Sequence, residues 1–167
     1  NAPVSLDGMV LVLYNGNGDV SYRSIDLTGQ TIAAKGFFVL GNSGVTSASI
    51  TFPNDTLQNG ADAVALYVGS IATFPTDTPP TTTAGILVDA LVYDTNDADD
   101  TGLIGALNPS KPQINESVNG LNESQAMARS PDGGADFDTT LDAAQAPTPG
   151  KTNVLLTGYE LWKSAVG

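Results

Sequence analysis

Glycine and proline interrupt this chain at short intervals, and this punctuation limits what it can fold into. Eighteen glycines and ten prolines occur among 167 residues, so long helices are disfavoured. Between them lie short runs rich in Val, Leu, Ile, Tyr and Phe, the residue types that favour strands. Turn signals recurring roughly every 8–12 residues are typical of an antiparallel β-sandwich, which is the fold class that we predict.

Seven segments form bounded apolar or alternating runs, and each is predicted to be a strand. They are residues 8–14, 20–25, 37–40, 49–52, 61–67, 85–93 and 124–129. The first and the sixth are almost wholly apolar, as in strands that are covered on both faces. Between the first two stands Asn15-Gly-Asn-Gly18, and Asn-Gly supplies the positive-φ residues of a type I′ hairpin turn.

The remaining segments predict loops, a short helix and a tail. Leu103–Leu107 is expected to form one or two helical turns stopped by Pro109, and residues 111–122 to form a loop. Residues 75–83, which are rich in Pro and Thr, predict an extended, mobile surface loop inside the domain. We expect one domain over residues 1–153, followed by a tail or linker at 154–167.

The charge of the chain restricts its partners. Six Lys and Arg residues against eighteen Asp and Glu residues give a formal net charge of −12. Such a surface repels phosphates and anionic lipids, so we expect no nucleic-acid partner. No apolar run approaches the ~20 residues of a membrane span, and no membrane insertion is expected. Calcium and basic proteins are the favoured partner classes.

The chain contains no cysteine and no histidine, which limits its chemistry. Zinc sites, thiol nucleophiles and Ser-His-Asp triads are excluded by this inventory. A pair of carboxylates could serve a glycoside hydrolase, but the dense acids lie together on one loop. No acid is placed opposite them across a predicted cleft. We therefore predict that the protein is not an enzyme.

An acidic loop follows the strand at 85–93 and is the candidate metal site. Its possible calcium ligands are Asp94, Asn96, Asp97, Asp99 and Asp100. Asp97, Asp99 and Thr101 alternate and Gly102 stands at the sixth position, as in a calcium-binding loop, although the twelfth residue is Asn108 and not Glu. The alternative is structural: these carboxylates would cap a helix that begins near Thr101.

Several segments, taken in order, resemble a bacterial lamin-tail domain. The resemblance covers about residues 5–153. Its main pieces are Leu6-Asp-Gly-Met-Val-Leu-Val-Leu-Tyr-Asn-Gly-Asn-Gly18, Lys35-Gly-Phe-Phe-Val-Leu-Gly41, Leu57-Gln-Asn-Gly-Ala-Asp-Ala-Val-Ala-Leu-Tyr67, Val88-Asp-Ala-Leu-Val-Tyr93 with the acidic loop, Gln125-Ala-Met-Ala-Arg129 and Pro147-Thr-Pro-Gly150.

The resemblance implies an immunoglobulin-like sandwich at the cell surface or outside the cell. It implies a non-enzymatic role in adhesion, interaction or spacing within a larger protein. One alternative is a structural subunit that assembles into an extracellular filament by strand or tail exchange. Another is an accessory domain of an extracellular nuclease, because lamin-tail domains are also found attached to such enzymes.

The chain departs from the lamin-tail pattern at both ends. The first strands of the family are missing or supplied from elsewhere, so we expect an open sheet edge that favours protein partners or self-association. Residues 153–162 could fill this edge or dock on another subunit; the alternative is a linker. Within the domain, Arg129 is predicted to form a structural ion pair. Asp89 is predicted to face outward or to bind loop backbone N–H groups.

Overall fold

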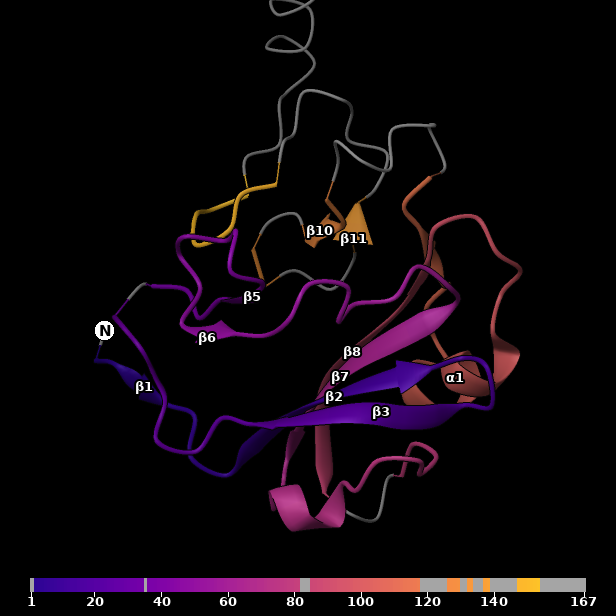
Figure 1. Ribbon diagram of the computed structural model, residues 1–167, viewed down its shortest axis with the longest axis horizontal. Coiled ribbons are helices and arrows are strands. Elements are labelled where there is room, and N and C mark those ends of the chain that lie inside the picture. Colours follow the sequence, from indigo (N-terminus) through magenta and orange to yellow (C-terminus); the bar gives the residue numbers. More distant parts are fainter. Residues whose placement is uncertain are drawn as a thin grey trace, which may run out of the picture.

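A five-stranded sheet in the order β3-β2-β7-β8-β9 lies at the centre of the molecule (Figure 1). The computed structural model describes residues 2–34, 36–81, 85–117, 126–129, 132–133, 137–138 and 147–153. The strands of this sheet are β2 Met9–Asn15, β3 Val20–Asp26, β7 Asp62–Val68, β8 Ile86–Asp94 and β9 Ile114–Asn115. Neighbouring strands are antiparallel, except that β8 and β9 are parallel.

The other described strands are short and form two-stranded sheets. They pair β1 Val4–Ser5 with β4 Thr31–Ile32, β5 Leu40–Gly41 with β6 Ile50–Thr51, and β10 Ala128–Arg129 with β11 Phe137–Asp138. The β5–β6 pair is parallel. The helical elements are the 3-10 helix η1 Ile71–Thr73 and the helix α1 Thr101–Leu107. The all-β class is confirmed, while the immunoglobulin-like topology stays a prediction.

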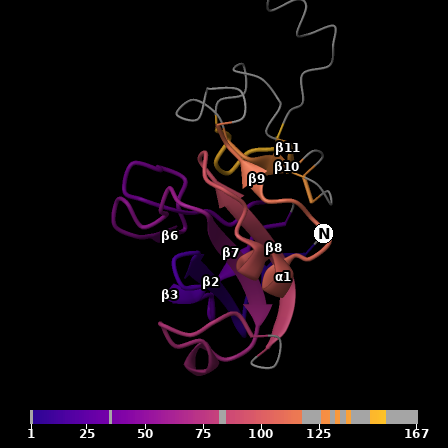
Figure 2. The ribbon, with the colours of Figure 1, turned by 90° about the vertical axis from the view of Figure 1, so that its right-hand side faces the viewer.

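One face of the central sheet buries the main core against α1, and Figure 2 shows α1 lying on β8. Alternate residues of a strand point to the same face, and this places one set of side chains together. The buried set comprises Val10, Val12, Tyr14, Ala63, Ala65, Tyr67, Phe74, Ala90, Val92, Leu103 and Leu107. The Tyr14 and Tyr67 hydroxyls lie 3.2 Å apart, so their polar ends satisfy each other inside this core.

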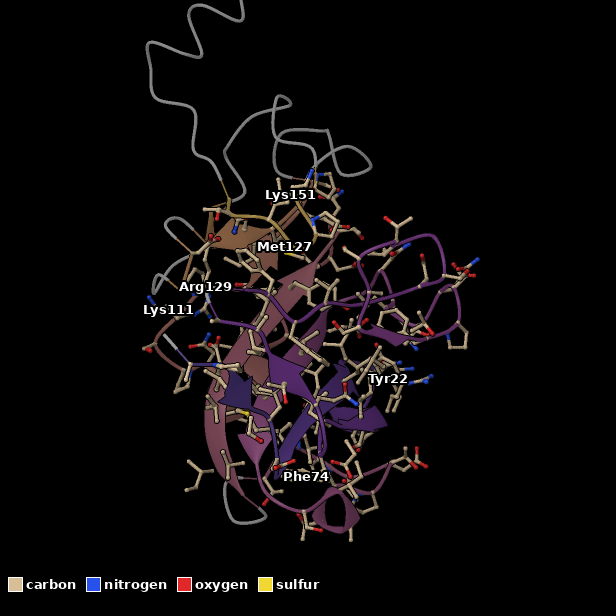
Figure 3. All side chains as sticks on the ribbon, turned by 90° about the vertical axis from the view of Figure 1, so that its left-hand side faces the viewer. Tyr22, Phe74, Lys111, Met127, Arg129 and Lys151 are labelled. Atoms are coloured by element: carbon tan, nitrogen blue, oxygen red, sulfur yellow. The ribbon has the colours of Figure 1, made fainter. Side chains whose placement is uncertain are left out.

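The opposite face is covered by irregular segments. The Tyr93 hydroxyl donates to the Gln58 carbonyl at 3.2 Å, and the Tyr22 hydroxyl donates to the Thr56 carbonyl at 3.0 Å. Arg129 on β10 contacts Asp89 on β8, with Nη2 and Oδ1 2.7 Å apart. The structural ion pair predicted for Arg129 is confirmed, and its partner is the outward-facing Asp89. Figure 3 shows Arg129 near Met127 and Lys151, at the opposite end of the molecule from Phe74.

The predicted hairpin over 8–25 is confirmed, but its predicted turn is wrong. Asn15 pairs with Val20, so residues 16–19 form a four-residue loop. Positive φ occurs at Gly18 (101°) and Asp19 (54°), and not at the Asn15-Gly16 pair. The Asn15 side chain instead accepts a hydrogen bond from the Asn17 N–H at 2.7 Å. This local bond stabilises a longer loop than a type I′ turn provides.

Two segments differ from their predicted secondary structure. In the predicted strand 37–40 only Leu40 belongs to a strand, and Phe37 is 42% exposed. The predicted loop 111–122 contains β9, and the Glu116 N–H donates to the Asp94 carbonyl at 3.0 Å. Both differences concern pairing with distant residues, and a two-residue strand is too short to have a recognisable period.

Within the surface loop predicted for 75–83, residues 75–78 are hydrogen-bonded to β3. The Ser21 N–H donates to the Thr78 carbonyl at 2.8 Å, and the Asp77 N–H donates to the Ser21 carbonyl at 2.7 Å. The Ser24 hydroxyl donates to the Phe74 carbonyl at 2.7 Å. These bonds satisfy backbone groups that an edge strand would otherwise expose, which explains why the segment is held. Residues 82–84 lie outside the described part.

In the described ranges, no helix combines the length and the apolar character that crossing a bilayer requires. The hypothesis that residues 153–162 dock on the sandwich lies outside the described residues, apart from Asn153. The Asn153 side chain donates to the Arg129 carbonyl at 3.1 Å, and its N–H donates to Asp132 Oδ1 at 3.1 Å. Residue 153 is therefore attached to the sandwich beside β10.

Replacing Leu103 by Ala should destabilise the fold strongly. Leu103 is 0% exposed and joins α1 to the core. A seven-residue helix depends on such packing, so the loss should be about 2–5 kcal/mol in the free energy of unfolding. Urea unfolding followed by circular dichroism measures it. Leu57→Ala is the control, because Leu57 is 49% exposed and should change stability by less than about 0.5 kcal/mol. Equal effects of the two variants would contradict this account of the core.

Candidate functional site

An acidic pocket of about 330 Å³ lies where three loops meet at one end of the central sheet. The loops are the β2–β3 turn, the entry to β7 and the β8–α1 connection, which meet near α1 in Figure 1. The lining residues are Asn15, Gly16, Asn17, Gln58, Gly60, Ala61, Asp62, Asp97, Ala98, Asp99 and Asp100. Four of them carry carboxylates and none carries a positive charge, so the pocket favours cations.

Gly16 allows the first two loops to approach each other closely. Its N–H donates to Asp62 Oδ1 at 3.1 Å. A β-carbon at Gly16 would collide with the Ala61 carbonyl oxygen and with Asp100 Oδ2. Gly16 has no positive φ, so this position requires glycine for lack of space and not for backbone conformation.

Asp62 is the most buried carboxylate of the pocket. It is 2% exposed, and within the described ranges its Oδ2 has no hydrogen-bond partner, although Oδ1 accepts from the Gly16 N–H. Burial raises the pKa of Asp62, and the nearby charges of Asp100 and Asp97 raise it further. Ionisation of Asp62 is therefore unfavourable here, because only one of its two oxygens has a hydrogen-bond partner among the described residues.

Asp100 caps α1, which agrees with the predicted alternative that carboxylates of the acidic loop cap a helix beginning near Thr101. Its Oδ1 accepts from the Leu103 N–H at 2.8 Å. Asp19 approaches from the β2–β3 loop, and its pKa is raised by burial and by the negative charge of Asp100. A β-carbon at Gly102 would collide with the Asp19 carboxylate. Two acids from distant segments thus face each other at the start of α1.

Gln113 connects Asp94 with the acidic loop. Its Nε2 donates to Asp94 Oδ2 at 2.7 Å, and its Oε1 accepts from the Asp100 N–H at 2.8 Å. Asp94 is 1% exposed, and its Oδ1 has no partner. Burial raises the pKa of Asp94; burial and the charge of Asp94 also raise the pKa of Glu116. Asp94 is not among the residues that line the pocket.

The structure separates the predicted calcium ligands into two groups. Asp97, Asp99 and Asp100 line the pocket, whereas Asp94 and Asn96 do not. Thr101 is the first residue of α1, so residues 97–102 do not form an EF-hand loop. Within the described ranges no group of three acidic side chains is placed to hold a metal ion by itself. Any ion would also need carbonyl, amide or water oxygens.

Sequence reasoning missed Asp62, Asp19 and Gly16. A weak signal was present, because each aspartate directly precedes or begins a strand after a glycine-containing turn. That signal does not say which turns lie side by side. The partnership with Asp100 depends on the pairing of β2 with β7 and on the position of α1.

A second candidate surface lies at the other end of β7, and we call it the exposed apolar edge. It comprises Val68, Ile71, Ile86 and Val88, which are 44%, 36%, 71% and 50% exposed. Val68 and Ile86 are paired across β7 and β8. The Phe74 ring lies against Gly85 at this end (Figure 3). Exposed apolar side chains gathered at one site are typical of interaction surfaces.

The ionisable side chains of the main core are Tyr14 and Tyr67. Burial raises the pKa of both Tyr14 and Tyr67, so neither phenol ionises near neutral pH. Comparison of the chain with protein-family models, with curated proteins and with solved structures gives no match. The lamin-tail resemblance therefore stays a prediction from the residues.

The free energy of unfolding should depend on the ionisation of Asp62. An acid whose pKa is raised on folding binds its proton more tightly in the folded chain, so its contribution lowers stability as pH rises above about 4. With a chelator present, Asp62→Asn should be more stable than wild type at pH 7, and the difference should shrink near pH 4. Urea unfolding at both pH values measures it. The exposed Asp55→Asn is the control; a similar gain there would contradict the assignment to Asp62.

Replacing Gly16 by Ala should destabilise the pocket. The new methyl group would meet the Ala61 backbone carbonyl, which cannot move aside as a side chain would. A loss of about 1–3 kcal/mol in the free energy of unfolding is expected. Gly105→Ala in α1 is the matched control, because its methyl group meets nothing within 4 Å and helix propensity improves by up to about 1 kcal/mol. Urea unfolding of both variants measures these changes. An unchanged free energy of unfolding for Gly16→Ala would contradict the close approach of Gly16 to the Ala61 carbonyl.

Proposed function

We propose that this chain is a non-enzymatic β-sandwich module of a larger protein, and that the module binds a protein partner. By the lamin-tail resemblance, the larger protein would act at the cell surface or outside the cell. The observation that carries the proposal is the exposed apolar edge, where Ile86 and Val88 are 71% and 50% exposed on a strand whose first half has β7 as its only strand neighbour among the described residues. Apolar side chains beside unpaired strand groups form a site for an added strand.

The free part of β8 is its first half. No described strand pairs with residues 86–92 on the side away from β7, and β9 joins only at Tyr93 and Asp94. The Asn108 side chain donates to the Ala90 carbonyl at 3.1 Å and blocks the edge there. The outer backbone edge of residues 86–89 is therefore the part of β8 that a partner strand could pair with. On β7, opposite these residues, the strand register shifts between Leu66 and Tyr67. We infer a short added strand anchored by apolar side chains.

The charge of the chain favours a basic partner. At a net charge of −12, a second copy of the chain would be repelled and a Lys- or Arg-containing segment attracted. The runner-up is the filament subunit, in which the same edge would bind another copy. The third candidate, an accessory role beside a nuclease, follows from the resemblance alone. The acidic surface opposes direct binding of nucleic acid.

A labelled peptide of alternating Lys and Val tests the proposal. Fluorescence anisotropy should show that it binds the intact chain, and a Glu-Val peptide of equal length should bind less. The double variant Ile86→Asp/Val88→Asp should weaken binding at least about tenfold, which corresponds to 1.4 kcal/mol. Val4→Asp/Leu57→Asp is the control, because it also adds two negative charges, at exposed sites elsewhere.

Hydrogen exchange locates the binding site. Residues 86–89 should gain amide protection when the Lys-Val peptide is bound. Equal binding by the double variant, or protection elsewhere only, would overturn the proposed edge. Size-exclusion chromatography with light scattering separates the runner-up, since concentration-dependent oligomers that the double variant abolishes would support the filament subunit instead.

A further inference from the structure

We propose that the acidic pocket binds one calcium ion, with Asp62, Asp100 and the Ala61 carbonyl oxygen as its protein ligands. The ion would join the entry to β7 and the start of α1, two segments far apart in the sequence. This site lies at the opposite end of β7 from the exposed apolar edge and does not depend on partner binding there.

The strongest pointer to a ligand is Asp62. Asp62 is 2% exposed, it lines the pocket, and its Oδ2 has no hydrogen-bond partner among the described residues. Buried polar atoms in folded proteins are nearly always satisfied, and an exception calls for an ion or water. An ionised Oδ2 in this position needs a positive charge or a donor, and no described residue gives it either one.

A second pointer is the crowding of oxygens beside Gly16. The Ala61 carbonyl and Asp100 Oδ2 both approach the point where a β-carbon of Gly16 would stand. Both are acceptors when Asp100 is ionised, so both can serve as ligands to a cation that lies beside Gly16. Asp100 Oδ1 is already used by the Leu103 N–H, which leaves Oδ2 for the ion.

The ligand chemistry selects calcium among metal ions. The chain has no His or Cys, so the ligands are all oxygens and soft or borderline metals are disfavoured. Calcium accepts six to eight oxygens in irregular geometry at about 2.3–2.6 Å, whereas magnesium requires a near-octahedral set. A cavity of about 330 Å³ leaves room for water to complete the shell. Asp97 and Asp99 at the rim add negative charge.

Calcium titration of the intact chain tests this site. After removal of divalent ions with a chelator, calcium should raise the melting temperature progressively and release or absorb heat in calorimetry, up to about 10 mM. Magnesium at the same ionic strength should give a smaller rise. Terbium should bind the same site and emit on excitation of tyrosine, because Tyr22 and Tyr93 lie close enough to Asp62 for its charge to raise their pKa values. Calcium should displace it.

Two variants remove one ligand each. Asp100→Asn keeps the helix cap, because Asn caps as well as Asp, and Asp62→Asn keeps an oxygen for the Gly16 N–H. Each should weaken calcium binding at least tenfold, with circular dichroism confirming the fold. The exposed Asp55→Asn should bind calcium as wild type does. An unchanged melting temperature with no heat, or equal responses to calcium and magnesium, would overturn the proposal. So would calcium affinity retained by both ligand variants.

Discussion

The antiparallel pairing of β2 with β7 supports the rest of the structure. The two strands pair without interruption from Met9 with Val68 to Asn15 with Asp62. Their buried side chains provide half of the main core, and Tyr14 and Tyr67 join their hydroxyls across it. The same pairing also sets the two candidate surfaces. One end of the pair holds the acidic pocket, and the other end leads to the exposed apolar edge.

The two ends differ in how the sheet is finished. At the pocket end, the turn after β2 lies against Ala61 and Asp62. The contact is so close that Gly16 has no room for a side chain. Carboxylates from several segments gather there with too few donors, which a fold selected for stability alone would avoid. At the other end, β8 begins with β7 as its only strand neighbour in the described part of the chain, and it exposes Ile86 and Val88. Both departures from a well-satisfied surface occur where a ligand or partner would supply the missing contacts.

Long apolar runs were predictable, and short pairings were not. The strands at 8–14, 20–25, 61–67 and 85–93 and the helix at 103–107 agree with the structure, since their periodicity and turn residues are local properties. Capping of α1 by Asp100 was likewise readable from residue type and position. The turn type after Asn15, the attachment of residues 75–78 to β3 and the strand β9 were not, because each depends on hydrogen bonds to distant residues.

The sequence by itself determined the all-β class, the acidic character of the surface and the exclusion of thiol, imidazole and zinc chemistry. These follow from composition and from local patterning, which need no knowledge of contacts. Only the tertiary structure decided that Asp62 and Asp19 meet Asp100 while Asp94 and Asn96 stay outside the pocket. Strand register and the packing of α1 bring those side chains together, and both are set by contacts between residues far apart in the chain.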